Sequence, residues 1–208
     1  MGRRRVAVTL THKNMNIDYN NITDFSRSSE ELTAFLMWCT VTPGKRSDVI
    51  TPKFNSMFTD EDTPTKLIRA HGKTVRTALE KAGIGQYDRI SKCWKQVSKI
   101  IKPKNLLADI TRDDLIKIDG IGPKTASFFV AHSQPWSEVA VLDTHILQYL
   151  QQEFPKYPVP SATPQDLDEY KRLEYMFLGI ACSKDMAPHE LDTHIWKQRT
   201  HSQTTIQL

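Results

Sequence analysis

The residues of this 208-residue sequence that point most directly to chemistry are a lysine and an aspartate, Lys124 and Asp143. Lys124 stands in the first turn of a predicted helix, where a cation opposes the helix dipole and gains no stability from it. Asp143 follows an apolar run and begins another predicted helix. Taken singly, Lys124 is better explained as a phosphate contact and Asp143 as an N-cap. Together, an amine and a carboxylate are the groups that cleavage of an N-glycosidic bond requires, because positive charge develops on the sugar.

The segment just before Lys124 predicts a tight reversal between two helices. Two glycines separated by one residue supply the turn, and Pro123 suits the first position of the helix that follows. Uncovered backbone N–H groups at such a helix start can grip a DNA phosphate without reading sequence. The predicted DNA contacts here are Gly120, Ile121, Gly122 and Thr125. Packing alone is the other explanation for a glycine turn of this kind.

Positive charge is concentrated in one part of the chain. Residues 65–104 hold eleven Lys or Arg and two acidic residues, although the formal net charge of the whole sequence is only +4. Such a segment suits a polyanion, because each neutralised phosphate releases condensed counterions. A predicted helix over 88–102 places Arg89, Lys92 and Lys95 on the face opposite its apolar residues, and we predict that these three contact DNA. A solvated basic face is the alternative.

The elements that must position these residues are predicted to be almost entirely helical. Ser, Thr and Asp recur at cap positions, and Gly and Pro recur at stops. The expected helices cover about 28–40, 64–72, 73–82, 88–102, 111–118, 123–132, 143–153, 163–180 and 188–198. No apolar run approaches the roughly 20 residues that span a bilayer, and three widely spaced cysteines build no disulfide framework. We therefore predict a cytoplasmic protein without a membrane segment.

Three stretches of the sequence resemble the helix-hairpin-helix plus Gly/Pro-Asp (HhH-GPD) superfamily of DNA glycosylases. They are residues 115–129, the Gln-Pro-Trp turn at 134–136 and residues 141–146, in which hairpin, lysine and aspartate occur in order. The resemblance extends more weakly over about 31–196. The string Gly-Ile-Gly-Pro-Lys-Thr-Ala-Ser-Phe-Phe, followed by Val-Leu-Asp-Thr-His-Ile-Leu, is most similar to short 8-oxoguanine-glycosylase-like proteins that lack an extra β domain.

This resemblance implies an all-α, two-lobed DNA glycosylase fold. The central lobe, 29–133, would contain the helix-hairpin-helix, and the second, 1–28 plus 134–208, would carry Asp143. Lys124 would be the Schiff-base nucleophile of a bifunctional glycosylase and AP lyase, and Asp143 would assist its deprotonation and stabilise the oxocarbenium-like transition state. The implied partner is double-stranded DNA with a damaged or modified base, and 8-oxoguanine is the first candidate for that base. The protein is expected to be a monomer. The base would be flipped out of the duplex.

Several positions depart from the superfamily's pattern. Where endonuclease III has a four-cysteine iron–sulfur cluster, this chain offers only Cys182, so we predict no cofactor and no metal. Thr40 stands where endonuclease III has a glutamine that fills the gap left by the flipped base. Phe128, one helical turn after Lys124, could stack on that base, with a core position as the alternative. Trp136, in its turn, is the tryptophan most free to line a cleft.

Two further sequence patterns involve residues near the C-terminus. Leu-Asp-Thr-His-Ile recurs at 191–195, but no hairpin precedes it, so we interpret Asp192 as a helix cap. Cys182, His189 and His194 are too irregularly spaced to predict a metal site.

One rival function is that of a non-catalytic DNA-binding module, which has no need of both Lys124 and Asp143. The other is a monofunctional glycosylase, or an enzyme for another modified base, in which Lys124 only contacts phosphate.

Overall fold

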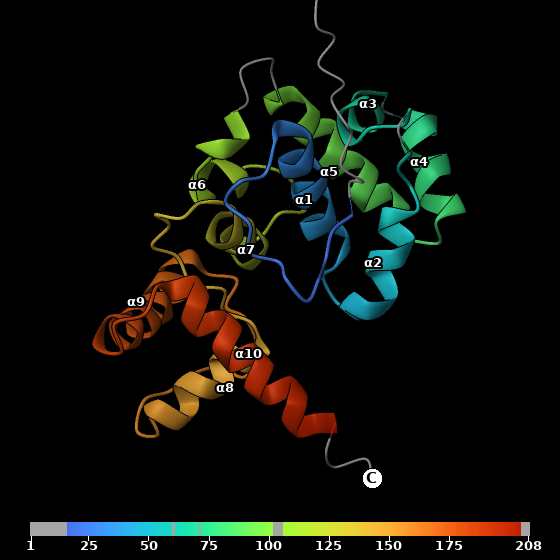
Figure 1. Cartoon of the computed structure of the whole chain (residues 1–208). Helices are drawn as coiled ribbons and strands as arrows, with labels where there is room; N and C mark the ends of the chain where they lie inside the picture. Colours follow the sequence, from blue (N-terminus) through green and yellow to red (C-terminus); the bar gives the residue numbers. More distant parts are fainter. Residues whose placement is uncertain (1–15, 60, 71, 102–105, 205–208) are drawn as a thin grey trace, which may run out of the picture.

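The computed structural model describes residues 16–59, 61–70, 72–101 and 106–204, and these residues form helices with no strand (Figure 1). The helices are α1 (Ser29–Val41), α2 (Ser47–Asn55), α3 (Pro64–Ala70), α4 (Gly72–Lys81), α5 (Tyr87–Ile100), the 3-10 helix η1 (Leu106–Ala108), α6 (Arg112–Leu115), α7 (Pro123–Ser133), α8 (Thr144–Glu153), α9 (Leu167–Ser183) and α10 (Pro188–Thr204). The predicted all-α class is confirmed. None of the described helices is both long enough and apolar enough to span a bilayer.

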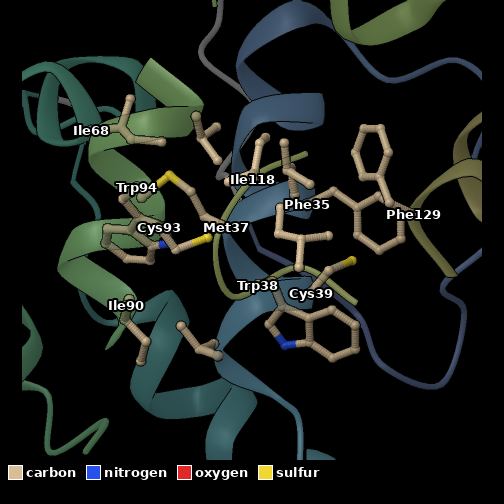
Figure 2. Packing of buried hydrophobic residues seen from close by; sticks show 14 of the residues in the cluster. Phe35, Met37, Trp38, Cys39, Ile68, Ile90, Cys93, Trp94, Ile118 and Phe129 are labelled. Carbon is tan, nitrogen blue, oxygen red and sulfur yellow. The ribbon is translucent and has the colours of Figure 1, made fainter. Parts of the chain in front are cut away.

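Helix α1 is the centre of the first hydrophobic core. Every residue from Leu32 to Val41 is buried, as expected for a helix that is apolar all round. The helix packs against α2, α3, α5, α7 and η1, and Figure 2 shows its side chains meeting those of α5 and α7. A capping box fixes its start, since Ser28 Oγ accepts from Glu31 N and Glu31 Oε2 accepts from Ser28 N.

A second core lies in the C-terminal third of the chain. Leu147 and Leu150 of α8, Tyr170 and Phe177 of α9 and Leu191 of α10 belong to one buried cluster. In Figure 1 these three helices lie together, to one side of the helices that surround α1. The described residues therefore form two lobes, joined through the chain after α7.

The chain before α1 differs from the expected division. We placed residues 1–28 with the second lobe, but Ile17, Tyr19 and Ile22 pack against the first core. The Asn55 side chain of α2 holds this strap (residues 16–28), because its Oδ1 accepts from Ile17 N at 3.1 Å and its Nδ2 donates to Ile17 O at 3.0 Å. Residues 1–15 lie outside the described residues. The strap also contacts the second lobe, through an edge-on contact between Phe25 and His189.

Some helix boundaries also differ from the expected ones. Helix α2 was not predicted from the sequence, and it holds Pro52 in its interior. Helix α9 begins after Asp166, whose side chain accepts from Glu169 N, and not at 163 as expected. Gln86, in a left-handed conformation, precedes α5, so Asp88 is not its N-cap and instead pairs with Arg76 at 2.5 Å. The start of α9 is thus set by a local cap further along the chain, and the start of α5 by an unusual turn.

Candidate active site

The hairpin between α6 and α7 is built as the glycines predict. Gly120 has a φ of +91°, which only glycine adopts without strain, and a side chain there would meet Arg89 and Cys93 of α5. Ile121 is buried and pins the turn to the first core, whereas Gly122 is the N-cap of α7 and has no side chain to cover the helix start. The first N–H groups of α7 therefore remain available to an anion.

Arg89 has a different position from the one that its helical face predicts. Its Nη2 donates to Thr40 O at 2.8 Å, its Nη1 lies 3.4 Å from Gly120 O, and its Nε donates to Gln86 Oε1. The guanidinium thus ties α1, α5 and the hairpin together, so any role in DNA binding includes holding the hairpin in place. Lys92 and Lys95 are exposed on α5, as expected for a basic outer face.

The salt dependence of DNA affinity tests this face of α5. We expect Lys92→Ala combined with Lys95→Ala to reduce the slope of log K against log salt concentration by about two units, because each lost phosphate contact releases about one counterion fewer. Fluorescence anisotropy of labelled DNA, titrated at a series of salt concentrations, measures this slope. The exposed lysines of the second lobe, Lys156 and Lys184, provide the matched double-alanine control. A slope unchanged in the Lys92/Lys95 variant would remove this face from the interface.

Lys124 and Asp143 line the same cavity. It has a volume of about 630 Å³ and lies between the two lobes, with walls from the strap, α1, α7, the chain before α8 and α10. Lys124 reaches it from the second position of α7, and Asp143 reaches it from the N-cap of α8. The sequence placed these two residues on different lobes, and the packing of the lobes brings them to one space.

Asp143 has two roles in this position. Its Oδ1 accepts from Ile146 N at 2.9 Å, so the aspartate caps α8 as its local sequence predicts. Burial raises the pKa of its carboxyl group, and this is the largest effect; the Ile146 hydrogen bond opposes it, the Asp192 carboxylate adds to it, and His145 and Lys124 lower the pKa by smaller amounts. A partly desolvated carboxylate that shares a cavity with an ammonium group is suited to accept a proton or to stabilise a cation.

The extended segment before Asp143, residues 140–142, is held by side chains of the second lobe. Tyr170 of α9 donates its hydroxyl hydrogen to Ala140 O at 2.8 Å and accepts from Leu142 N at 3.2 Å. Thr163 donates to Leu142 O at 2.7 Å. The segment also has a local backbone bond, since Val141 O accepts from Asp143 N at 2.7 Å. The location of Asp143 is therefore set by α9 and by the loop that precedes it.

A buried ion pair joins the hairpin's first helix to this segment. Arg112 of α6 donates through Nη1 to both carboxylate oxygens of Glu174 on α9, at 2.6 and 2.7 Å. Glu174 Oε1 also accepts from Ala140 N at 2.7 Å. The side chains of Arg112 and Glu174 are 11% and 4% exposed. This pair links the lobe that carries Lys124 to the lobe that carries Asp143.

Loss of this pair is expected to destabilise the protein markedly. We expect Glu174→Gln to lower the free energy of unfolding by about 3 kcal/mol, because Arg112 is left as an unbalanced buried charge. Denaturant unfolding followed by circular dichroism measures the change. The control is Glu169→Gln on the same helix, whose exposed pair with Arg172 should contribute less than about 1 kcal/mol. Equal effects of the two substitutions would contradict the interpretation.

The three weaker site predictions have different outcomes. Thr40 is fully buried, and its Oγ1 donates to Met37 O and accepts from Trp94 Nε1 at 2.8 Å, so the structure argues against a gap-filling role. Trp136 is 91% exposed but does not line the cavity. Phe128 does line it, half-buried, with its ring packed against Trp38 and His132. Phe128 therefore belongs partly to the core and partly to the cavity wall, and its stacking on a flipped base stays a prediction.

Asp192 and His132 are cavity residues that sequence reasoning missed. Asp192 lies within α10 and not at its cap, so the sequence interpretation was wrong, and its Oδ2 is 3.4 Å from Nε2 of the buried His132. The repeated Leu-Asp-Thr-His-Ile was the available signal, since its two aspartates face the same cavity. His189 and His194 also line the cavity, but within the described residues no cluster of His, Cys, Asp and Glu could hold a metal ion.

The fold is that of helical DNA glycosylases. No family model matches the sequence. The Methanocaldococcus jannaschii 8-oxoguanine glycosylase/lyase, solved with a 15mer DNA containing 8-oxoguanine, is similar over 87% of this chain and 86% of its own, with 21% sequence identity and a TM-score of 0.66. The Thermotoga maritima 8-oxoguanine DNA glycosylase is similar over 81% of this chain and 79% of its own, with 17% identity and a TM-score of 0.60. The resemblance drawn from the sequence is thereby confirmed at the level of the fold.

Proposed function

We propose that this protein is a DNA glycosylase of base-excision repair with AP lyase activity, acting through Lys124 and Asp143. The observation that carries the proposal is that both side chains line one cavity between the lobes, beside the uncapped start of α7. A non-catalytic clamp would need the hairpin but would not need an amine and a partly desolvated carboxylate in a common space. Because a single chain supplies both groups, a monomer is sufficient.

The geometry suggests how the reaction proceeds. The hairpin N–H groups hold the phosphate backbone, and the damaged nucleotide leaves the duplex and enters the cavity. Asp143 accepts a proton from the Lys124 ammonium and stabilises positive charge on the sugar as the glycosidic bond breaks. The neutral amine forms a bond to C1′ while the base departs with the bonding electrons and takes up the proton that Asp143 accepted. The C1′–O4′ bond of this aminal then breaks, O4′ takes up the proton that the amine nitrogen loses, and a ring-opened imine results. The imine permits loss of a C2′ proton and β-elimination of the 3′ phosphate.

The proposed substrate is an oxidised base in duplex DNA, and 8-oxoguanine is the first candidate. The similar M. jannaschii protein was crystallised with DNA that contains this base, which supports the choice. The cavity volume of about 630 Å³ is within the range of ligand sites, which is about 300–1,000 Å³. An aromatic wall from Trp38 and Phe128 suits the flat face of a base.

A panel of duplexes, each with one modified base, tests the proposal. We expect base release and strand cleavage with 8-oxoguanine and no reaction with the unmodified duplex, measured on end-labelled DNA with and without hot alkali. Base release without strand cleavage would favour a monofunctional glycosylase. Binding of every duplex with no base release would overturn the proposed function and leave a DNA-binding module.

A further inference from the structure

The hydroxyl of Tyr170 lies where the helix that carries Lys124 meets the segment that leads to Asp143. Tyr170 belongs to α9, and its side chain is fully buried. Burial raises the pKa of this hydroxyl, so the group keeps its proton at neutral pH. A neutral hydroxyl has one hydrogen to donate and two lone pairs with which to accept.

Three partners use the whole capacity of this hydroxyl. It donates to Ala140 O at 2.8 Å and accepts from Leu142 N at 3.2 Å. The third hydrogen bond joins it to the buried side chain of Ser127 on α7. Because the single hydrogen of Tyr170 goes to Ala140, Ser127 is the donor in this third bond. The hydroxyl thus has two partners on the segment before α8 and one on α7.

Both reactive groups lie close to these partners along the chain. Ser127 follows Lys124 by three residues of the same helix, which is about 4.5 Å along the helix axis. Leu142 directly precedes Asp143, the N-cap of α8. One oxygen atom of Tyr170 therefore connects the two backbones within one helical turn of the amine and one residue of the carboxylate.

The buried ion pair between α6 and α9 surrounds the same hydroxyl. The guanidinium of Arg112 lies 5.8 Å from the centre of the Tyr170 ring, and its Nη1 lies 3.5 Å from Ser127 Oγ. Glu174, one turn after Tyr170 on α9, accepts from Ala140 N at 2.7 Å. A buried ion pair adds little net stability compared with apolar packing, but its hydrogen bonds have a fixed geometry. These bonds hold the hydroxyl and its partners in one arrangement.

We propose that Tyr170 is a positioning residue for the glycosylase reaction, and that its hydroxyl sets the separation of Lys124 and Asp143. Both groups must act at one sugar carbon, and a displacement of about 1 Å can slow such a reaction on the order of 100-fold. Tyr170 itself does not line the cavity, so it acts through these two residues. The inference rests on the proposed function and adds the residue that aligns the two lobes for it.

Replacing Tyr170 with phenylalanine tests the inference, because this change keeps the ring and removes only the oxygen. We expect single-turnover base release from an 8-oxoguanine duplex to slow on the order of 10- to 100-fold. DNA affinity, measured by fluorescence anisotropy, should change by less than about 3-fold, because the phosphate contacts are kept. Borohydride trapping on an abasic duplex should also change by less than about 3-fold, because Lys124 there condenses with a free sugar aldehyde and no sugar cation needs Asp143.

A double-mutant cycle separates positioning from general support of the fold. In the Asp143→Asn background, Tyr170→Phe should slow base release further by less than about 3-fold, because the carboxylate that the hydroxyl positions is already absent. A variant that only weakens the fold would lose the same factor in both backgrounds. Equal losses in the two backgrounds therefore overturn the inference, as do equal losses in base release and in abasic-site trapping.

Two further variants complete the experiment. Tyr149→Phe removes a hydroxyl from α8 in the same lobe, where it bonds to Glu153 away from the cavity, and should leave base release unchanged. Ser127→Ala keeps the bonds of Tyr170 to Ala140 and Leu142 and removes only the bond to α7. We expect it to slow base release on the order of 10-fold, with the same dependence on Asp143, and it replaces Tyr170→Phe if that variant does not fold.

The wild-type protein separates failure of this inference from failure of the proposed function. If wild type releases no base from the 8-oxoguanine duplex, the proposed function fails and the inference fails with it. If wild type is active and the variants that lack the Tyr170 or Ser127 hydroxyl are as fast, only the inference is overturned.

Discussion

Replacing Lys124 with glutamine is expected to abolish the covalent complex that borohydride traps between this protein and an 8-oxoguanine duplex. Glutamine keeps a polar side chain at the cavity but has no amine to form an imine, so trapping and strand cleavage should each fall by at least about 1,000-fold. Denaturing gel electrophoresis of labelled DNA measures both. The position is half-buried at the start of α7, and removal of a cation from a helix N-terminus does not disfavour the helix.

A second lysine at the same cavity provides the control for this experiment. Lys45 also lines the cavity, but its Nζ donates to Ile84 O at 2.7 Å and is held away from the role of nucleophile. Lys45→Gln should therefore still be trapped. Trapping that survives in Lys124→Gln would assign the imine to another amine and would contradict the proposed mechanism.

Replacing Asp143 with asparagine is expected to slow base release by about 100- to 10,000-fold while leaving the fold intact. Asparagine is as good an N-cap as aspartate, so the bond to Ile146 N and the start of α8 should be preserved. The substitution removes the negative charge that would stabilise the sugar cation and accept the lysine proton. Single-turnover kinetics at saturating protein measures the rate, and thermal unfolding measures the fold.

Another aspartate of the chain separates charge at the site from capping. Asp166 caps α9 with the same geometry, its Oδ1 accepting from Glu169 N at 2.9 Å, but it does not line the cavity. Asp166→Asn should leave the rate of base release unchanged. Comparable losses in the two variants would indicate that Asp143 acts only as a cap.

The parts of the structure that depend on local sequence were the predictable ones. The cap at Ser28, the Gly120 turn, Pro123 at the start of α7 and the cap at Asp143 all lie where the residue types place them. Each of these features is decided within about one helical turn, where backbone hydrogen bonding and side-chain size outweigh distant contacts. The same short segments contain the hairpin, the lysine and the aspartate, so the candidate catalytic residues could also be predicted from the sequence.

The parts that depend on tertiary packing could not be predicted. Thr40 is a polar residue near the end of α1, yet it is buried between helices, where its hydroxyl accepts a hydrogen bond from Trp94 of α5. Arg112 and Glu174 are far apart in the sequence and carry no local pattern that would pair them. Asp192 follows the pattern of a cap, but α10 begins earlier and turns the carboxylate into the cavity.

The site of the covalent bond tests the central role of Lys124 most directly. The wild-type protein is trapped with borohydride on an 8-oxoguanine duplex, digested with nuclease and protease, and analysed by tandem mass spectrometry. We expect the reduced sugar remnant on Nζ of Lys124, within the peptide that contains the start of α7. A remnant on Lys45, on the N-terminal amine or on any other lysine would contradict the assignment of the nucleophile.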